Sequence, residues 1–317
     1  MEKRGVVIVL VLLLISSFLV SCKPRGPGTE PLETAAALRI VKTGMQGVEI
    51  NTLPNYPPAT PIYDLNELQA IVEVKNKGNH NLEPQDCFIV VTGFDPNIIR
   101  GGFTSARSCA ENVNVLEGKS VYNLEGGVNQ IEFRSPNVEL DPSVFDYNPT
   151  LNFQACYNYH TTASPEVCVD PLFYQIASEQ IACNWRQGVN VGGGQGAPVG
   201  VSYVRAEMVR GRAIFDINVQ NFGIGRVLSP FTDLQTCELN LQFTDFDKVA
   251  YAVEMGGVPG DCKPRDGFVR LYNNQGKITC SFDIYGSSAY VTPLLIDLDY
   301  NYVQSFKKNV KIIRTPQ

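Results

Sequence analysis

The chain has 317 residues, a formal net charge of −6 and a pI of about 5.1. Proteins that bind nucleic acid are typically basic, so an acidic chain without a block of Lys and Arg predicts no nucleic-acid partner. Only two histidines occur, His80 and His160, which leaves little material for a histidine base or a multi-histidine metal site.

The chain opens with a charged segment and an apolar run typical of an export signal. Lys3 and Arg4 precede an apolar stretch over residues 6–20 that only Ser16 and Ser17 interrupt. About 15 residues rise roughly 22 Å as a helix, short of the roughly 30 Å hydrocarbon core, so we expect cleavage rather than a free-standing membrane helix. The positive charges at the front predict that the rest of the chain lies outside the cytoplasmic membrane.

The end of this run, Leu19-Val20-Ser21-Cys22, resembles a lipobox. The resemblance implies a signal peptide over residues 1–22 and a lipid on Cys22, which becomes the first residue of the mature chain. Residues 23–37 begin with closely spaced prolines and glycines, and we expect them to form a flexible tether.

Two alternatives for the leader stay open. Lys3-Arg4-Gly5 before an apolar run also resembles an archaeal pilin-type leader, which is cut after Gly5 and leaves the apolar stretch on the protein as an assembly helix. The other alternative is an uncleaved anchor, or cleavage at a nearby site without lipidation.

Two later segments share one pattern of alternating apolar and polar residues. It covers residues 151–160 and 294–303, and both copies contain Tyr-Asn-Tyr, at 157–159 and at 300–302. A period of two with aromatic and branched residues predicts half-buried antiparallel strands. A polar turn and a short strand follow each copy, at 166–170 and 309–313, so we expect each copy to close with a hairpin.

An upstream strand repeats as well, over residues 70–75 and 215–220. Each copy ends in Asn-x-Gly, at Asn76-Lys77-Gly78 and Asn221-Phe222-Gly223, which predicts a turn because both residue types tolerate positive φ. No long amphipathic helix is evident. Further expected strands are 87–93, 129–134, 202–209, 237–243, 249–253 and 268–271.

Many short strands, twice over, predict an all-β fold of two tandem β-sandwiches. The strand followed by Asn-x-Gly, the aromatic penultimate strand and the short last strand resemble the immunoglobulin-like modules of archaeal and bacterial surface proteins, notably the CARDB-like cell-adhesion group. The expected organisation is one sandwich over residues 38–171, a glycine-rich linker over 172–200 and a second sandwich over 201–317.

Nine cysteines occur, and assigning Cys22 to a lipid leaves eight. An even number in an exported chain without Cys-x-x-Cys pairs predicts four disulfides rather than a zinc site. Cross-strand neighbours in the first hairpin would be Cys156 and Cys168, because Asp299 and Lys311 take their places in the second copy. Repeat symmetry then predicts Cys87 with Cys109 and Cys237 with Cys262, which leaves Cys183 with Cys280.

Few residues suggest chemistry. Residues 192–196 are glycine-rich but lack the Lys-Ser/Thr of a phosphate loop. Asp297 with Asp299, and Asp245 with Asp247, are expected on solvated strand faces, and His160 on the surface next to a turn. The single tryptophan, Trp185, is expected to pack near the junction of the domains.

These observations predict no enzyme, no metal and no cofactor. We expect a disulfide-bonded lipoprotein on the outer face of the cytoplasmic membrane, acting as a structural, adhesion or binding module. Its partners would be the membrane, through the N-terminal anchor, and an unidentified surface protein or glycan. The alternatives are a pilin-like filament subunit and a carbohydrate-binding or hydrolase accessory module.

Overall fold

The structure is a computed structural model that describes residues 34–174 and 183–316. The predicted signal peptide, Cys22 and most of the tether lie outside the described residues. Residues 37–317 form one compact unit that is nearly all β. The described part of the chain has one α-helix, α2 (Thr34–Lys42), and contains no helix with the length and hydrophobicity of a membrane span.

The first half of the chain contributes strands β1 (Val48–Thr52), β2 (Ile62–Tyr63), β3 (Leu68–Asn76), β4 (Cys87–Thr92), β5 (Arg107–Ser108), β6 (Val128–Ser135), β7 (Asp146–Tyr147), β8 (Thr150–Ala163) and β9 (Glu166–Val169). The second half contributes β10 (Val189–Asn190), β11 (Val199–Val209), β12 (Arg212–Asn221), β13 (Arg226–Leu228), β14 (Lys248–Met255), β15 (Val258–Pro259), β16 (Asp261–Lys263), β17 (Phe268–Arg270), β18 (Gln275–Asp283), β19 (Tyr290–Asn309) and β20 (Ile312–Ile313). Short 3-10 turns are η1 (Gly101–Thr104), η2 (Trp185–Gln187) and η3 (Phe243–Asp245).

The described strands form four sheets. The largest has the order β15-β14-β19-β8-β4-β5, with β9, β13 and β17 attached to it. A three-stranded sheet, β1-β3-β6, belongs to the first half, and a five-stranded sheet, β10-β11-β12-β18-β16, belongs to the second. A small sheet, β2-β20-β7, combines two strands of the first half with β20 of the second.

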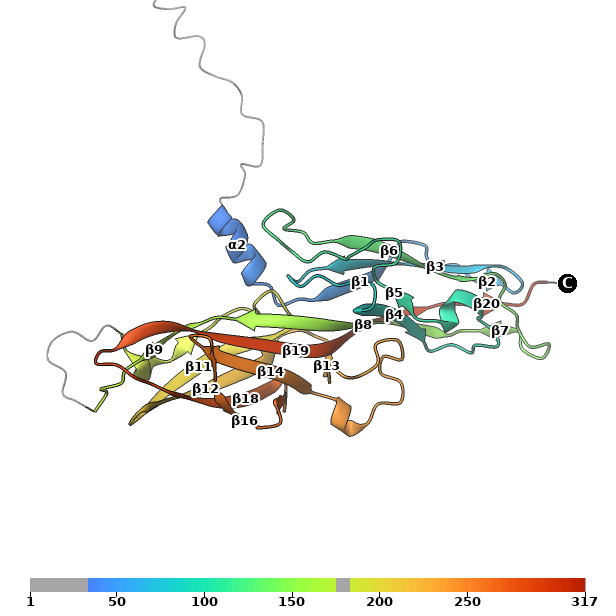
Figure 1. Cartoon of the computed structure of the whole chain (residues 1–317). Coiled ribbons are helices and arrows are strands. Elements are labelled where there is room, and N and C mark those ends of the chain that lie inside the picture. The colour runs from blue at the N-terminus through green and yellow to red at the C-terminus, as the bar shows by residue number, and fades with distance from the viewer. Residues whose placement is uncertain (1–33, 175–182, 317) are drawn as a thin grey trace, which may run out of the picture. The chain divides into compact units, whose positions relative to one another are not determined.

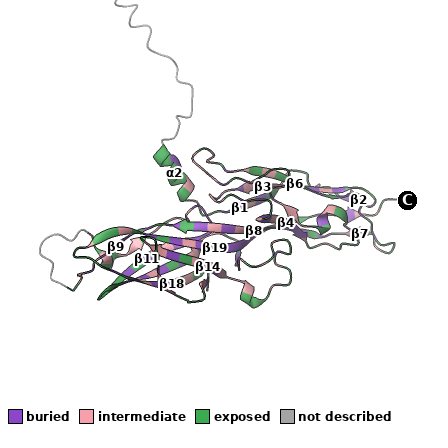
Figure 2. Cartoon of the chain, viewed as in Figure 1, coloured by how far each residue is buried: buried purple, intermediate pink, exposed green. Residues whose placement is uncertain are grey.

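The core is built from strands that bury one face. Every second residue of β3 and of β12 is buried, and Figure 2 shows similar banding along part of β19, where the buried residues alternate from Leu294 to Tyr300. Phe133 on β6 packs against Phe153 on β8, with ring centroids 6.1 Å apart, so an aromatic contact joins two different sheets of the first half. The period of two predicted from the sequence thus produces a sandwich-like architecture.

The two long strands β8 and β19 pair with each other along their length. Their antiparallel register runs from Ile296 opposite Ala163 to Asn309 opposite Thr150. Figure 1 shows the two ribbons next to each other in the middle of the largest sheet. The copies of the repeated strand are therefore direct neighbours.

The predicted closing hairpins do not form, because each half exchanges its last strand with the other. β9 of the first half pairs with the start of β19, and β20 of the second half pairs with β2 and β7. The physical reason is strand length. β8 has 14 residues and β19 has 20, so each continues past its own half and delivers the following strand to the other.

The structure contains four disulfides, and one of them has the predicted pairing. Cys87 is joined to Cys109, as the repeat predicted. The other three pairs are Cys156 with Cys237, Cys168 with Cys183, and Cys262 with Cys280.

The predicted pairs Cys156–Cys168, Cys237–Cys262 and Cys183–Cys280 are therefore wrong. The first fails because β9 leaves β8 and places Cys168 opposite Val291 of β19. The other two fail because Cys262 lies on β16, directly opposite Cys280 on β18.

Part of the predicted glycine-rich linker, residues 195–197, is held by hydrogen bonds to the first half. The Gly196 amide donates to the Gly44 carbonyl at 2.9 Å, and the Asn79 amide donates to the Gly196 carbonyl at 2.9 Å. The Asn79 side chain also donates to the Gln195 carbonyl. The glycine-rich stretch allows close contact between backbones here rather than free movement.

Candidate functional site

The pairing of β8 with β19 brings the two Tyr-Asn-Tyr segments together. Asn158 lies opposite Asn301, its own counterpart in the repeat, while Tyr157 lies opposite Tyr302 and Tyr159 opposite Tyr300. Counterparts that exchange places in this way are related by an approximate twofold axis, which passes between the two asparagines. The junction of the two halves is therefore the centre of the repeat.

Four tyrosines on the inner face of this junction are almost completely buried. Neighbouring ring centroids lie 5.6 Å apart for Tyr157 with Tyr159 and with Tyr302, and 6.4 Å apart for Tyr300 with Tyr159 and with Tyr302. Burial raises the pKa of all four hydroxyls, that of Tyr302 to about 12. All four hydroxyls are therefore neutral at physiological pH.

Two of these tyrosines hold the Asn-x-Gly segments by the same set of hydrogen bonds. The Tyr159 hydroxyl donates to Asn76 Oδ1 at 3.3 Å and accepts from the His80 amide at 3.2 Å. The Tyr302 hydroxyl donates to Asn221 Oδ1 at 3.1 Å and accepts from the Gly225 amide at 2.8 Å.

The glycines of these segments are needed for a different reason from the one predicted. Neither Gly78 nor Gly223 has positive φ. A Cβ on Gly78 would collide with the Tyr159 hydroxyl, and one on Gly223 with the Tyr302 hydroxyl. Close packing, and not turn geometry, therefore excludes a side chain at both positions.

The outer face of the junction departs from the twofold symmetry on one side. β3 connects to β4 through residues 77–86, whereas the corresponding connection from β12 to β14 takes residues 222–247. This longer stretch covers Cys156 on β8 and Val303 opposite it, and together with Val90, Leu228 and Cys237 they form a small buried apolar cluster. The Cys156–Cys237 disulfide ties the covering stretch to the other half.

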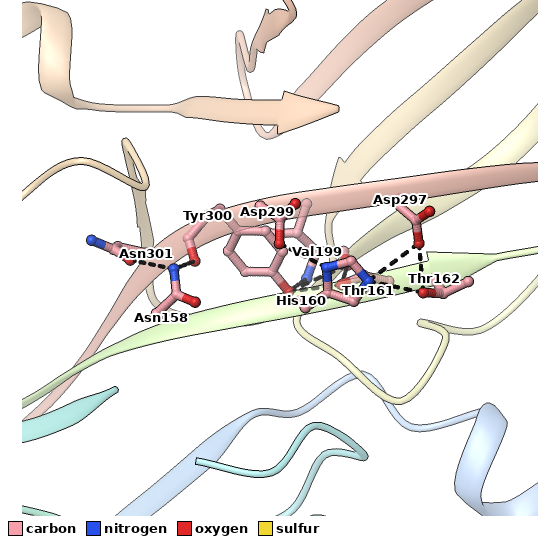
Figure 3. Close-up of polar contacts among 9 residues, drawn as sticks. All are labelled: Asn158, His160, Thr161, Thr162, Val199, Asp297, Asp299, Tyr300 and Asn301. Atoms are coloured by element: carbon pink, nitrogen blue, oxygen red, sulfur yellow. Dashed lines mark hydrogen bonds and ion pairs between the residues drawn. The ribbon is translucent and has the colours of Figure 1, made fainter. Parts of the chain in front are cut away.

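Among the residues that the structure describes, none forms such a cover on the symmetry-related side, which carries charged residues. His160 lies opposite Asp299 there, as Cys156 lies opposite Val303 on the covered side. Figure 3 shows the His160 ring between Asp299, Asp297 and Thr162. Its Nδ1 is 2.7 Å from Asp299 Oδ1, and its Nε2 is 3.2 Å from Asp297 Oδ1 and 3.0 Å from Thr162 Oγ1.

The second histidine of the chain lies beside the first. The His80 and His160 ring centroids are 5.9 Å apart, and His80 also packs edge-on against Tyr159 at 5.4 Å. The hydrogen bond and charge of Asp299 raise the pKa of His160, helped by Asp297. Burial, together with the neighbouring His160, lowers the pKa of His80. The pKa values of the two histidines are therefore shifted in opposite directions.

The order carboxylate, imidazole, hydroxyl over Asp299, His160 and Thr162 is also found in hydrolases. Two observations favour a different role here. The Thr162 hydroxyl donates to Asp297 at 2.7 Å, so its proton points to a carboxylate rather than to the imidazole. A raised pKa favours the protonated imidazole, which cannot act as a general base. The arrangement is best suited to hold an imidazolium between two carboxylates of β19.

Sequence reasoning found only part of this cluster. His160, Asp297 and Asp299 were expected on solvated faces, but the structure brings them together, and His160 lies within β8 rather than beside a turn. His80 and Thr162 were not predicted to take part. The register of the repeat was the available signal, because pairing Asn158 with Asn301 places His160 opposite Asp299.

The other residues singled out from the sequence take part in local hydrogen bonds and packing. Asp245 accepts a hydrogen bond from the Gln242 amide in η3, and Trp185 packs against Phe173 with ring centroids 6.1 Å apart. Within residues 34–174 and 183–316, no three His, Cys, Asp or Glu side chains are grouped so that they could hold a metal ion.

Comparisons with known proteins give no relative. No protein-family model matches the sequence, and no curated protein matches it. Among solved structures, the secreted serine protease VesC from Vibrio cholerae aligns with a TM-score of 0.19 and 10% identity, covering 83% of this chain and 51% of that one. The chain spans about half the length of that protein, and a likeness this weak carries no argument about fold or function.

Proposed function

We propose that the chain is a non-catalytic lipoprotein on the outer face of the cytoplasmic membrane and acts as a rigid adhesion or binding module. In this proposal Cys22 carries the lipid, and two immunoglobulin-like modules, over residues 38–171 and 201–317, follow the tether. We also propose that these modules are related to those of CARDB-like surface proteins. Four disulfides support an oxidising environment outside the cytoplasm.

The observation that carries the proposal is the reciprocal strand exchange. The two halves share the β8–β19 ladder, exchange β9 and β20, and are linked by the Cys156–Cys237 disulfide. Separating the halves would break all of these connections at once. A chain built in this way transmits force between its ends without a hinge, which suits a module that holds a ligand at a distance from its anchor.

Attachment is tested by expressing the full chain in a bacterial host with a lipoprotein pathway. We expect the N-terminal peptide from the membrane fraction to begin with a lipid-modified Cys22. Cys22→Ser should release the chain from the membrane, whereas Ser21→Ala, which keeps a small residue before the cysteine, should leave it attached. A chain beginning at Val6 in the membrane fraction would contradict the proposal and support the pilin-like alternative.

Rigidity is tested by pulling single molecules of the chain from residue 38 and from the C-terminus under oxidising conditions. The exchange predicts that both halves unfold in one cooperative event, because neither half keeps its sheets without a strand of the other. Two separate unfolding events of similar length would contradict a single rigid module.

A further inference from the structure

An open cavity of about 570 Å³ lies at one end of the second half, between its two sheets. Strands β12, β16 and β18 line one wall, and β14, β15 and the start of β19 line the other. The volume falls in the range of roughly 300–1,000 Å³ that is usual for small-molecule sites. The cavity is separate from the His160 cluster and from the Tyr-Asn-Tyr segments, and two of its lining residues, Tyr290 and Thr292, lie opposite β9 of the first half.

The cavity lies far along β19 from the junction. Tyr290, the first residue of β19, lines it, while Asn301 marks the twofold axis on the same strand. Eleven residues of extended strand span roughly 35 Å. The cavity therefore opens at the end of the second half that is remote from the twofold axis.

Two tyrosines at the cavity leave aromatic surface in contact with solvent. Tyr285 is 82% exposed and Tyr290 is 37% exposed, while Phe282 is buried at the cavity wall. Both rings line the cavity, whereas Tyr122 and Tyr272, which are also highly exposed, do not. Exposed aromatic surface of this kind is typical of binding sites.

The polar groups of the cavity are charged but nearly balanced. Arg212 Nε is 3.0 Å from Asp283 Oδ1, and both side chains are exposed at the rim. Asp261 adds a second carboxylate, and Ser281 and Thr292 also line the cavity. The one cation among the lining residues is paired with Asp283, which disfavours an anionic ligand, and the pair offers both donors and acceptors to neutral hydroxyl groups.

We infer that this cavity binds a neutral sugar unit of a surface glycan. A pyranose ring has an apolar face of C–H groups, which packs on an aromatic ring, and an edge of hydroxyl groups, which pairs with Arg212 and Asp283. The inference rests on the proposed function, because it names the ligand class of the proposed binding module. Tyr285 provides the stacking surface, and the Arg212–Asp283 pair provides orientation.

The test is calorimetric titration of the full chain, kept in a polyoxyethylene detergent that has no sugar headgroup. The probes are three neutral oligosaccharides, cellotetraose, chitotetraose and mannotetraose, and one anionic oligosaccharide, tetragalacturonate. We expect at least one neutral probe to bind and the anionic probe to bind more weakly or not at all. Tyr285→Ala should weaken binding of that neutral probe about tenfold, as loss of one aromatic contact predicts.

The matched control is Tyr272→Ala, since Tyr272 is also 82% exposed, belongs to the same half and does not line the cavity. It should bind like the parent chain. Asp283→Asn tests the polar edge and should also weaken binding. Failure of all three neutral probes, binding of the anionic probe alone, or equal effects of Tyr285→Ala and Tyr272→Ala would overturn the inference. None of these results would affect the membrane-attachment or force measurements, so the two proposals fail separately.

Discussion

Asn158 and Asn301 face each other across the centre of the molecule, and Nδ2 of Asn158 donates to Oδ1 of Asn301 at 2.9 Å. Their surroundings differ although they are counterparts. The Asn301 amide also donates to the carbonyl and hydroxyl oxygens of Thr232, in the stretch that covers this side of the junction. Asn301 is therefore buried, whereas Asn158 is only partly buried.

This difference predicts unequal effects of the same substitution. Asn301→Ala removes the side-chain donor to the Thr232 carbonyl and the acceptor of one Asn158 N–H, and we expect it to lower the free energy of unfolding by about 2–3 kcal/mol. Asn158→Ala should cost about 1 kcal/mol, because its position is open to water. Urea unfolding of both variants measures the difference, and equal losses would show that the cover does not bury the pair in solution.

The two histidines predict opposite dependences of stability on pH. The pKa of His160 is raised above its ordinary value of 6.5, so its contribution to stability is full below pH 6.5 and is lost as the pH rises through the raised pKa. The pKa of His80 is lowered, so its contribution is present above pH 6.5 and is lost as the pH falls through the lowered pKa.

Urea unfolding at pH values from about 5 to 9 compares the parent with His160→Gln and His80→Gln, which serve as controls for each other. The difference in free energy of unfolding between the parent and the His160 variant should shrink as the pH rises. The difference between the parent and the His80 variant should shrink as the pH falls. Asp86, Asp297, Asp299 and Thr162 are the other groups that face these rings, and they are unchanged in both variants. Parallel curves for the two variants would contradict the opposite pKa shifts.

The sequence predicted several of the long strands but not their partners, and the strand expected over residues 237–243 is wrong because these residues form turns and the start of η3. Residues 151–160 and 294–303 were correctly expected to be strands, because alternation is a local property that burial of one face requires. Pairing depends on how far a strand continues. Nothing local shows that β8 passes its own half and delivers β9 to the other, so the closing hairpins were predicted wrongly.

The same limitation explains the candidate site and the disulfides. Cys87 and Cys109 are joined within one half, and symmetry of the repeat was enough to predict them. The Cys156–Cys237 pair depends on the longer stretch of the second half, which has no counterpart in the first. His160 could be joined to Asp299 only by knowing that the two repeats pair with each other, since 139 residues separate them.

The disulfide between the halves should contribute more stability than the local one in the second half. Cys156–Cys237 has a sequence separation of 81, and Cys262–Cys280 one of 18. Loop-closure entropy predicts about 4.5 kcal/mol for the first and about 3 kcal/mol for the second. Denaturation of the Cys156→Ala/Cys237→Ala and Cys262→Ala/Cys280→Ala variants makes the comparison. A larger loss in the second variant would mean that the link between the halves adds little to the strand exchange.

The two glycines under the tyrosine hydroxyls should respond differently to one rescue substitution. A Cβ on Gly223 would meet the Tyr302 hydroxyl first and then only side-chain carbons, with Pro198 Cβ at 3.1 Å. A Cβ on Gly78 would meet the Tyr159 hydroxyl and also the carbonyl oxygens of Gly196 and Gln46, at 2.6 and 2.7 Å. Each Gly→Ala substitution should cost about 1–3 kcal/mol by overpacking.

Removing the tyrosine hydroxyl relieves the main collision at Gly223, but at Gly78 it leaves the collisions with the two backbone carbonyls. We therefore expect Tyr302→Phe to recover part of the stability lost in Gly223→Ala, and Tyr159→Phe to recover none in Gly78→Ala, because backbone carbonyls cannot move aside. Gly44→Ala is the control, since its Cβ would have ordinary contacts of 3.6 and 3.8 Å. Double-mutant cycles of thermal unfolding measure both couplings. Rescue of equal size at the two sites would contradict the role of the Gly196 and Gln46 backbone, and with it the close contact of the glycine-rich connection with the first half.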